Sequence, residues 1–348
     1  VPMTSVVSKY YKTATMVKIG LLGVGHLGKI HLKCLHTIEA VQITGFYDSD
    51  DQVAVKVMAN YPTLKRFTSY EELLVASDVV DIVTPTTTHF ALAAKAIKNN
   101  KHVFIEKPLT HTLEEARQLV ELAKMHRIKA QVGYVERFNP AFLSIQHIPL
   151  NPLFIEAHRL ATFNPRGTDV SVVLDLMIHD LDLVLKVVKA PLTSVHASGV
   201  AVVSKSPDIA NVRLEFANGA TANLTASRIS MKKMRKLRLF QKDAYISLDL
   251  LDKRAQVIQL FSEAEKSQIT NGNLLSLETE EGKKYINIEQ PAAEAINAIE
   301  RELTTFAQAI LTNTEPVVTI EEGYKTLQVA HQIIEKMEER KARVGTLT

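Results

Sequence analysis

Short apolar runs alternate with helix-like stretches over the first third of the chain. The apolar runs are VKIGLL at 17–22, VQITGFYD at 41–48, VVDIVT at 79–84, HVFIE at 102–106 and KAQVGY at 129–134. Between them, the sequence favours helices near 50–60, 70–77, 89–99 and 112–126, and a further short strand near 65–68. Repeated strand–helix units predict a doubly wound parallel sheet with right-handed crossovers, a Rossmann-type α/β fold.

The pattern changes after residue 136. Helices are expected near 139–147 and 171–188, and the segments that follow alternate apolar and polar residues, which predicts strands. These segments are 193–204, 209–219, 220–230, 235–241, 244–250 and 254–261, with the hairpin signal Asn218-Gly219 between two of them. The second half is therefore expected to be α+β, a mostly antiparallel open sheet with helices on one face. Amphipathic helices at 295–310 and 322–340 are expected to pack back on the first half.

The chain has 348 residues, more than one core usually supports, so we expect two domains. We place a dinucleotide-binding domain at 16–136 and a domain for substrate binding and oligomerisation at 137–348. Residues 1–15 lack the apolar core of a signal peptide. Because Met16 directly precedes the first strand, we expect these residues to be a disordered leader or an upstream-start artefact.

Composition restricts the classes of function. A formal charge of +3 is too small to indicate nucleic acid as the main partner, and no apolar run approaches the roughly 20 residues of a membrane span. The single cysteine, Cys34, excludes an intrachain disulfide and any zinc site built on several cysteines. We therefore expect a cytoplasmic protein with a small-molecule partner.

The first strand ends in GVGHLG, with Gly23, Gly25 and Gly28 before a helical pattern. In a strand–turn–helix context, the first glycine permits a tight turn, the second lets the backbone approach a pyrophosphate, and the third lets helix and strand pack closely. The phosphates would lie at the helix N-terminus. Asp48 ends the next strand, where its carboxylate can bind the ribose hydroxyls and repel a 2′-phosphate, so we predict NAD in preference to NADP.

Two further strand ends carry candidate site residues. Thr84-Pro85 and Glu106-Lys107 follow apolar runs, and ligands of open α/β sheets gather at the carboxyl ends of the strands. Lys107 is therefore expected to point into the crevice that holds the nicotinamide.

The stretch DLMIHDLD at 175–182 places Asp175, His179 and Asp182 at helical spacing within an apolar run. A metal site, an acid/base site and a buried polar network are the alternatives. We favour acid/base chemistry, because an imidazole accepts a proton near neutrality and Lys107 can stabilise the resulting negative charge. In this interpretation Asp175 orients His179 and Asp182 has a structural role. The roles of Lys107 and His179 are interchangeable at this stage, because a desolvated lysine can also act as the base.

Six motifs in order carry a family resemblance: GVGHLGKIH, TPTTTH at 84–89, EKP at 106–108, GYVERFNP at 133–140, DLMIHDLD at 175–182 and VTIEEG at 318–323. Their order resembles the glucose–fructose oxidoreductase, inositol dehydrogenase and rhizopine-catabolism (Gfo/Idh/MocA) family. The resemblance implies a nicotinamide-dependent oxidoreductase acting on sugars or cyclitols, with its motif lysine, aspartate and histidine at Lys107, Asp175 and His179. This sequence departs from the family pattern at Met177, where the family usually has a glycine.

RFNP, PRGTDV at 165–170 and the basic run at 228–240 resemble the branch that oxidises C3 of UDP-N-acetylglucosamine or its uronic acid. The expected catalytic residues are Lys107, His179 and Asp175. The expected cofactor contacts are Gly23, Gly25, His26, Leu27, Gly28, Asp48, Thr84, Pro85, Thr86, His89, Glu106 and Lys107. The expected substrate contacts are Lys107, Tyr134, Arg137, Arg159, Arg166, Asp175 and His179, and the arginines and the lysines at 232–236 compete for a diphosphate. No metal is expected.

Two rivals remain. One is a dehydrogenase of free cyclitols or monosaccharides, and the other is a dinucleotide-binding regulator without turnover. The open sheet leaves a face to cover, which in this family is usually done by another subunit, so we expect a homodimer or homotetramer.

Overall fold

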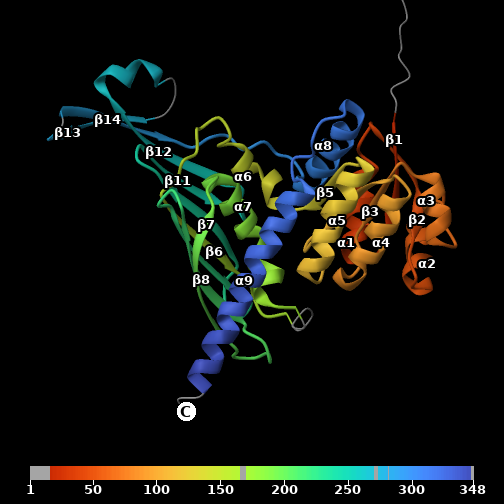
Figure 1. The fold of residues 1–348 in the computed structure, drawn as a ribbon. Coiled ribbons are helices and arrows are strands. Elements are labelled where there is room, and N and C mark those ends of the chain that lie inside the picture. Colours follow the sequence, from red (N-terminus) through yellow and green to blue (C-terminus); the bar gives the residue numbers. More distant parts are fainter. Residues whose placement is uncertain (1–15, 165–169, 270–272, 281, 346–348) are drawn as a thin grey trace, which may run out of the picture.

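The computed structural model describes residues 16–164, 170–269, 273–280 and 282–345 (Figure 1). Its first half is a five-stranded parallel sheet of order β2-β1-β3-β4-β5, covered by helices on both faces. The strands are β1 (Val17–Leu22), β2 (Val41–Tyr47), β3 (Val79–Ile82), β4 (His102–Glu106) and β5 (Ala130–Gly133). The helices are α1 (His26–Leu35), α2 (Asp51–Asn60), α3 (Tyr70–Ala76), α4 (Thr86–Lys98) and α5 (Leu113–His126). The doubly wound sheet is thus confirmed.

The central strands are buried on both faces, which explains their unbroken apolar runs. All of the residues of β3 and most of those of β1 are buried. The strand expected near 65–68 is reduced to one isolated bridge between Phe46 and Arg66.

The second half is built on a nine-stranded sheet of order β13-β14-β12-β11-β10-β6-β9-β8-β7, antiparallel except for the pair β6–β9. The strands are β6 (Phe154–Leu160), β7 (Leu192–Val200), β8 (Ile209–Phe216), β9 (Thr221–Ser227), β10 (Met234–Phe240), β11 (Ala244–Asp249), β12 (Arg254–Ser262), β13 (Asn273–Thr279) and β14 (Gly282–Glu289). The Asn218-Gly219 turn joins β8 to β9, with Gly219 at φ +82°. The sequence patterns did not indicate β6, β13 or β14.

Helices cover only one face of this sheet (Figure 1). Along β10, for example, Leu237 and Leu239 are buried toward the helices, while Arg238 between them is half-buried on the open face. The helical elements of this half are the short turns Val135–Phe138 and Glu263–Gln268, the π-helical turn Val173–Met177, α6 (Pro140–Leu143), α7 (Ile178–Val188), α8 (Ala298–Thr312) and α9 (Ile320–Gly345). The combination of an α/β and an α+β half is confirmed.

The two C-terminal helices join the halves. Leu303 and Phe306 of α8 share a core cluster with Val17 and Phe104 of the parallel sheet. Helix α9 packs against α5 of the first half and against β7 and α7 of the second. The chain thus returns to the first half at its end, as expected for 295–310 and 322–340.

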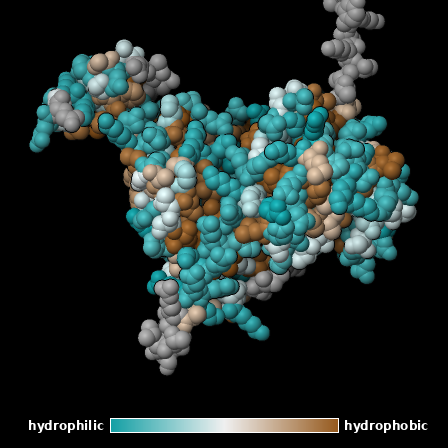
Figure 2. Space-filling view, viewed as in Figure 1, coloured by the Kyte–Doolittle hydropathy of each residue, from teal (hydrophilic) through white to brown (hydrophobic). Residues whose placement is uncertain are grey.

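The surface is mixed in character. Figure 2 shows hydrophobic residues in separate patches between hydrophilic areas, and the end of the sheet with β13 and β14 standing clear of the rest. Among the described residues, none of the helices has the length and apolar character that crossing a membrane requires.

Candidate active site

Each of the three glycines in the turn between β1 and α1 meets a different structural requirement. Gly23 has φ +84°, which side-chain-bearing residues rarely adopt. A Cβ on Gly28 would lie 2.1 Å from the Gly23 carbonyl oxygen, so this glycine permits the close packing of turn and helix. Around Gly25 no atom lies within 4 Å of the Cβ position, which leaves open space at the helix N-terminus. This arrangement fits a pyrophosphate approaching the backbone at Gly25.

Asp48 lies directly against this turn. Its Oδ2 accepts a hydrogen bond from the Val24 N–H at 2.8 Å, and its Oδ1 accepts one from the Asp50 N–H. The carboxylate is therefore placed at the end of β2 beside the glycine turn, where a dinucleotide's adenosine ribose would lie. His26 is exposed and Leu27 is half-buried at the start of α1.

The ends of β3 and β4 meet through His89. Its Nε2 lies 2.9 Å from the Thr84 carbonyl oxygen and its Nδ1 lies 3.0 Å from that of Pro108. Pro85 precedes α4 and Thr86 is its first residue. These residues line up along the carboxyl edge of the parallel sheet, next to the glycine turn, since a Cβ on Gly23 would contact Thr84.

Lys107 extends from the end of β4 toward the second half. Its Nζ donates a hydrogen bond to the Asp175 main-chain oxygen at 2.9 Å and lies 3.5 Å from the Asp175 Oδ1. Its side chain is 20% exposed. The ammonium is thus held at the boundary between the two halves.

His179 lines the same cavity as Lys107. Burial lowers the pKa of His179 well below its usual value, and the positive charges of Lys107, Arg159 and Arg235 lower it further. The imidazole is therefore neutral at pH 7 and available to accept a proton. The structure brings together the lysine and the histidine that the sequence places far apart.

The expected bond between Asp175 and His179 is not formed. The Nδ1 of His179 is buried without a hydrogen-bond partner, and Asp175 is engaged by Lys107 instead. The reason is local: Val173–Met177 form a π-helical turn, so Asp175 and His179 do not have the i,i+4 relation of a regular α-helix. Asp175 therefore orients the ammonium rather than the imidazole.

The other acidic residues of this stretch point away from the cavity into ion pairs. Asp182 is fully buried and bonds Arg137 through two contacts of 2.5 and 2.7 Å, as its structural assignment anticipates. Asp180 bonds Arg159 in the same bidentate manner at 2.9 and 2.8 Å. Asp175, His179 and Asp182 thus face different partners and do not form one site. Among the described residues, no three His, Cys, Asp or Glu side chains are grouped as metal ligands.

Two of the expected substrate contacts lie outside the cavity. Arg137 is 3% exposed, with its guanidinium occupied by Asp182, and Tyr134 is fully buried. We therefore drop both as substrate contacts. Arg166 lies outside the described residues.

The cavity around Lys107 and His179 has a volume of about 450 Å³ and is rich in cations. Arg159, Arg228, Lys233 and Arg235 line it together with Lys107, while its carboxylates are Glu136 and Asp175. Glu136 is shared, since its Oε1 lies 2.9 Å from Arg159 and 3.4 Å from Arg235. Lys233 has no ion-pair partner within the part of the chain that the structure describes. Even when Asp180, the ion-pair partner of Arg159, is included, the described residues give the cavity more cations than carboxylates.

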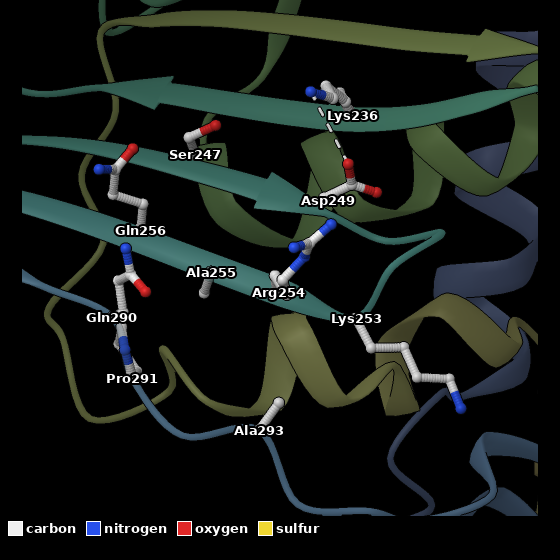
Figure 3. A pocket seen from close by; sticks show the side chains of 10 residues that line it. All are labelled: Lys236, Ser247, Asp249, Lys253, Arg254, Ala255, Gln256, Gln290, Pro291 and Ala293. Atoms are coloured by element: carbon white, nitrogen blue, oxygen red, sulfur yellow. Dashed lines mark ion pairs between the residues drawn. The ribbon is translucent and has the colours of Figure 1, made fainter.

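A second cavity lies on the opposite, open face of the same sheet (Figure 3). Lys236 of β10 points into it and lies 3.7 Å from Asp249 of β11. Strand β10 therefore sends Arg235 to the helix-covered face and Lys236 to the open face. This alternation separates the basic run into residues of the cavity beside Lys107 and residues of a solvated face.

Sequence reasoning missed the importance of Arg235, Glu136 and a buried histidine, His31. Arg235 alternates with the buried Leu237, a signal that would have placed it on the inner face. His31 has both ring nitrogens bonded, to Asp81 at 3.0 Å and to Glu106 at 3.1 Å. Those partners come from different strands, so no local pattern indicates them.

Comparisons with known proteins agree with this architecture. Residues 17–134 match the model of an oxidoreductase family with an NAD-binding Rossmann fold, and residues 155–246 match the GFO/IDH/MocA C-terminal domain. The UDP-N-acetylglucosamine 3-dehydrogenase of Acidithiobacillus ferrooxidans is 39% identical over 237 residues, which cover 68% of this chain and 75% of that protein. The scyllo-inositol 2-dehydrogenase (NAD(+)) of Bacillus subtilis is 31% identical over 234 residues, covering 62% of this chain and 68% of that protein.

Solved structures show the same fold. The structure of the Acidithiobacillus ferrooxidans enzyme superimposes with a TM-score of 0.82 at 32% identity, covering 93% of this chain and 98% of that one. A scyllo-inositol dehydrogenase from Lactobacillus casei with bound NAD(H) and scyllo-inositol gives 0.73 at 20% identity, covering 93% and 98%. The glycine turn, the Rossmann sheet and both matched regions identify the chain as a member of the Gfo/Idh/MocA family of NAD-binding oxidoreductases.

Proposed function

We propose that this protein is an NAD-dependent dehydrogenase that oxidises a secondary hydroxyl of an anionic, nucleotide-linked amino sugar, with C3 of UDP-N-acetylglucosamine as the leading candidate. The observation that carries the proposal is the excess of cations around Lys107 and His179. A neutral sugar gains nothing from such an excess, whereas a diphosphate or a uronate offers anionic oxygens to it.

The proposed chemistry uses residues that line one cavity. NAD, when bound, supplies the hydride acceptor. His179 is neutral and takes the proton of the substrate hydroxyl, while the Lys107 ammonium stabilises the negative charge that develops on the same oxygen. Asp175 fixes the direction of the ammonium through its main-chain oxygen. The cations around His179 favour its neutral form, so we assign it the role of base.

The proposed cofactor contacts follow the carboxyl edge of the parallel sheet. The open space at Gly25 receives the pyrophosphate, and Asp48 faces the adenosine ribose and disfavours a 2′-phosphate. Thr84, Pro85 and Thr86 continue this edge toward Lys107, while His89 and Glu106 lie buried behind it with their polar atoms bonded within the protein. We propose NAD rather than NADP on the basis of Asp48.

The substrate assignment is tested by following NADH formation with UDP-N-acetylglucosamine, its uronic acid, free N-acetylglucosamine and scyllo-inositol. We expect turnover with a UDP-sugar and at least about 100-fold lower kcat/KM with the neutral compounds, because charge-assisted hydrogen bonds contribute about 1.5–3 kcal/mol each. Equal or faster turnover of scyllo-inositol would favour the cyclitol rival. Tight NADH binding without turnover of any compound would favour the regulator.

The contribution of the cavity cations to substrate binding is tested with matched variants. Arg235→Met and Lys233→Met each remove a positive charge from the cavity and should raise KM for the UDP-sugar about tenfold. Lys232→Met removes the same charge from the adjacent exposed position, which does not line the cavity, and should leave KM unchanged. Equal effects at Lys232 and Lys233 would mean that only the overall charge matters.

We further propose that the protein is a cytoplasmic homodimer or homotetramer that covers the open sheet face. Phe154, Phe240 and Tyr245 form neighbouring ring pairs on that face, with centroids 5.5 and 4.9 Å apart. Such an aromatic group on an otherwise polar sheet is typical of subunit interfaces. Light scattering on the purified protein tests this, and a monomer at micromolar concentration would contradict it.

A further inference from the structure

Beneath the active-site edge lies a buried charged cluster that the proposed chemistry does not use. Its centre is His31 of α1, which is fully buried. Asp81 of β3 and Glu106 of β4 face the two ring nitrogens, and Glu302 of α8 lies in the same cluster. The cluster thus joins four elements of the fold.

The imidazole is held between two carboxylates. Its Nδ1 lies 3.0 Å from the Asp81 Oδ2 and its Nε2 lies 3.1 Å from the Glu106 Oε1. Burial alone would lower the pKa of His31, but the charges and hydrogen bonds of Asp81 and Glu106 outweigh it and raise this pKa well above its usual value. An imidazolium donates to both carboxylates at once, which a neutral ring cannot do.

The other acidic groups of the cluster are shifted as well. Burial raises the pKa of Asp81, while the positive charge and hydrogen bond of His31 oppose that rise. Burial raises the pKa of Glu302 well above its usual value, and the negative charge of Glu106 raises it further. Both of its carboxyl oxygens are buried without a hydrogen-bond partner, so we treat Glu302 as protonated. Cys34, one turn further along α1, is a buried thiol whose pKa is raised by burial. Phe104 packs its ring edge-on against the imidazole at 5.6 Å.

Glu106 connects this cluster to Lys107. Its Oε1 is held by His31, and its Oε2 accepts a hydrogen bond from the Lys107 main-chain N–H at 3.0 Å. A Cβ on Gly133 would lie 2.7 Å from the same carboxylate, so β5 closes the third side. Orienting contacts behind a functional group commonly determine whether it is placed accurately.

We propose that His31 is a positioning residue that, through Glu106, fixes the end of β4 so that the Lys107 ammonium reaches the Asp175 carbonyl oxygen. Because His31 lies on the helix that follows the glycine turn, it also ties the cofactor-side helix to the strand that carries the lysine. Only the kinetic test described below rests on the proposed function, because the placement of Lys107 can be measured without turnover.

The first test measures the reactivity of Lys107 in the full-length protein. Acetic anhydride labelling, followed by peptide mass spectrometry, gives the modification rate of each lysine. In His31→Gln we expect Lys107 to react at least about fivefold faster, because it loses its fixed contact with Asp175. Lys129 is the internal reference, since its side chain is 15% exposed and ion-paired to Glu315 at the opposite edge of the sheet. An unchanged Lys107/Lys129 rate ratio would overturn the proposal.

The second test separates positioning from packing. His31→Gln should lower kcat about 10- to 100-fold and change KM for NAD and the sugar by less than about threefold. Glu302→Gln removes a carboxyl from the same cluster without touching the bonds to Glu106, and should keep both kcat and the labelling ratio within twofold. If Glu302→Gln matches the loss in His31→Gln, the effect is general packing and the proposal is wrong.

A third variant covers the case in which His31→Gln does not fold. Asp81→Asn retains the bond from His31 to Glu106 and should leave the labelling ratio of Lys107 within twofold, whereas an increase as large as fivefold would contradict the path through Glu106. If the wild-type protein turns over no sugar, the proposed function fails while the labelling result still decides the role of His31.

Discussion

A histidine in each half of the molecule has its pKa shifted by its surroundings, and the two end in different charge states. His31 in the first half lies between Asp81 and Glu106, and is protonated. His179 in the second half lies near Lys107, Arg159 and Arg235, and is neutral. Burial disfavours the charged form in both places, so the difference comes from the sign of the neighbouring charges.

The difference in protonation distinguishes a histidine that holds neighbouring groups from one that can accept a proton. A protonated imidazole between two carboxylates has both nitrogens engaged, so it can hold neighbouring groups but has no lone pair to accept a proton. A neutral imidazole facing a cavity retains that lone pair. Burial and residue type are therefore insufficient to assign a role, and the charges of the first neighbours decide it.

The largest expected effect is loss of the proposed base. His179→Gln should lower kcat about 10²- to 10⁴-fold, the usual contribution of general acid–base catalysis, with the unfolding temperature nearly unchanged. Steady-state kinetics and calorimetry measure both quantities. A loss smaller than tenfold would return the role of base to Lys107.

The next effect concerns stability. Asp182→Ala leaves the buried guanidinium of Arg137 with only its longer contact to Glu322 at 3.6 Å, which should lower the free energy of unfolding by about 3–5 kcal/mol. Urea denaturation measures it, and Asp252→Ala, which removes an exposed partner of Arg254, is the control with an expected change below about 1 kcal/mol. Similar values for the two would mean that the buried pair contributes no more than a surface one.

The comparison also predicts the direction of the pH dependence. Since the pKa of His179 is lowered, its basic form persists as pH falls, and the acid limb of kcat/KM should lie below the ordinary histidine value of about 6.5. Removing a neighbouring charge with Arg235→Met should move this limb upward. A limb at or above 6.5 in the wild type would contradict the charge environment described here.

The smallest effect is expected at Asp175. Lys107 bonds the main-chain oxygen of Asp175 at 2.9 Å and its carboxylate only at 3.5 Å, so Asp175→Asn keeps the shorter contact. We expect kcat to fall less than about tenfold, because the exchange replaces only the longer charged contact. A loss as large as that of His179→Gln would mean that the carboxylate acts directly on the substrate.

Much of the fold was predictable because its signals are local. The apolar runs of β1, β3 and β4 follow from burial on both faces of a parallel sheet, and the Asn218-Gly219 turn specified its hairpin. Strand β6 was missed, because it pairs with β10 and β9, which come much later in the chain. The β13–β14 hairpin was missed as well, since exposed leucines such as Leu275 weaken its alternation.

The site was predictable only in part for the same reason. Glycine spacing and strand ends placed Gly25, Asp48 and Lys107, because each depends on its own segment of chain. The partners of Asp175, Arg137 and His31 depend on packing between segments 45 to 75 residues apart, which periodicity does not encode. The helical spacing of Asp175 and His179 was also misleading, because a π-helical turn separates them.

That turn has a consequence for how the chain tolerates change in length. The i→i+5 bonding of a π-helical turn accommodates one residue more than an α-helical turn, so deleting one residue within Val173–Met177 would remove the bulge while the residues of α7 keep their faces. Deleting Leu181 from the regular part of α7 would instead turn everything after it by about 100° around the helix axis and carry Asp182 away from Arg137. The chain is therefore expected to tolerate a one-residue deletion in the π-helical turn better than one within α7.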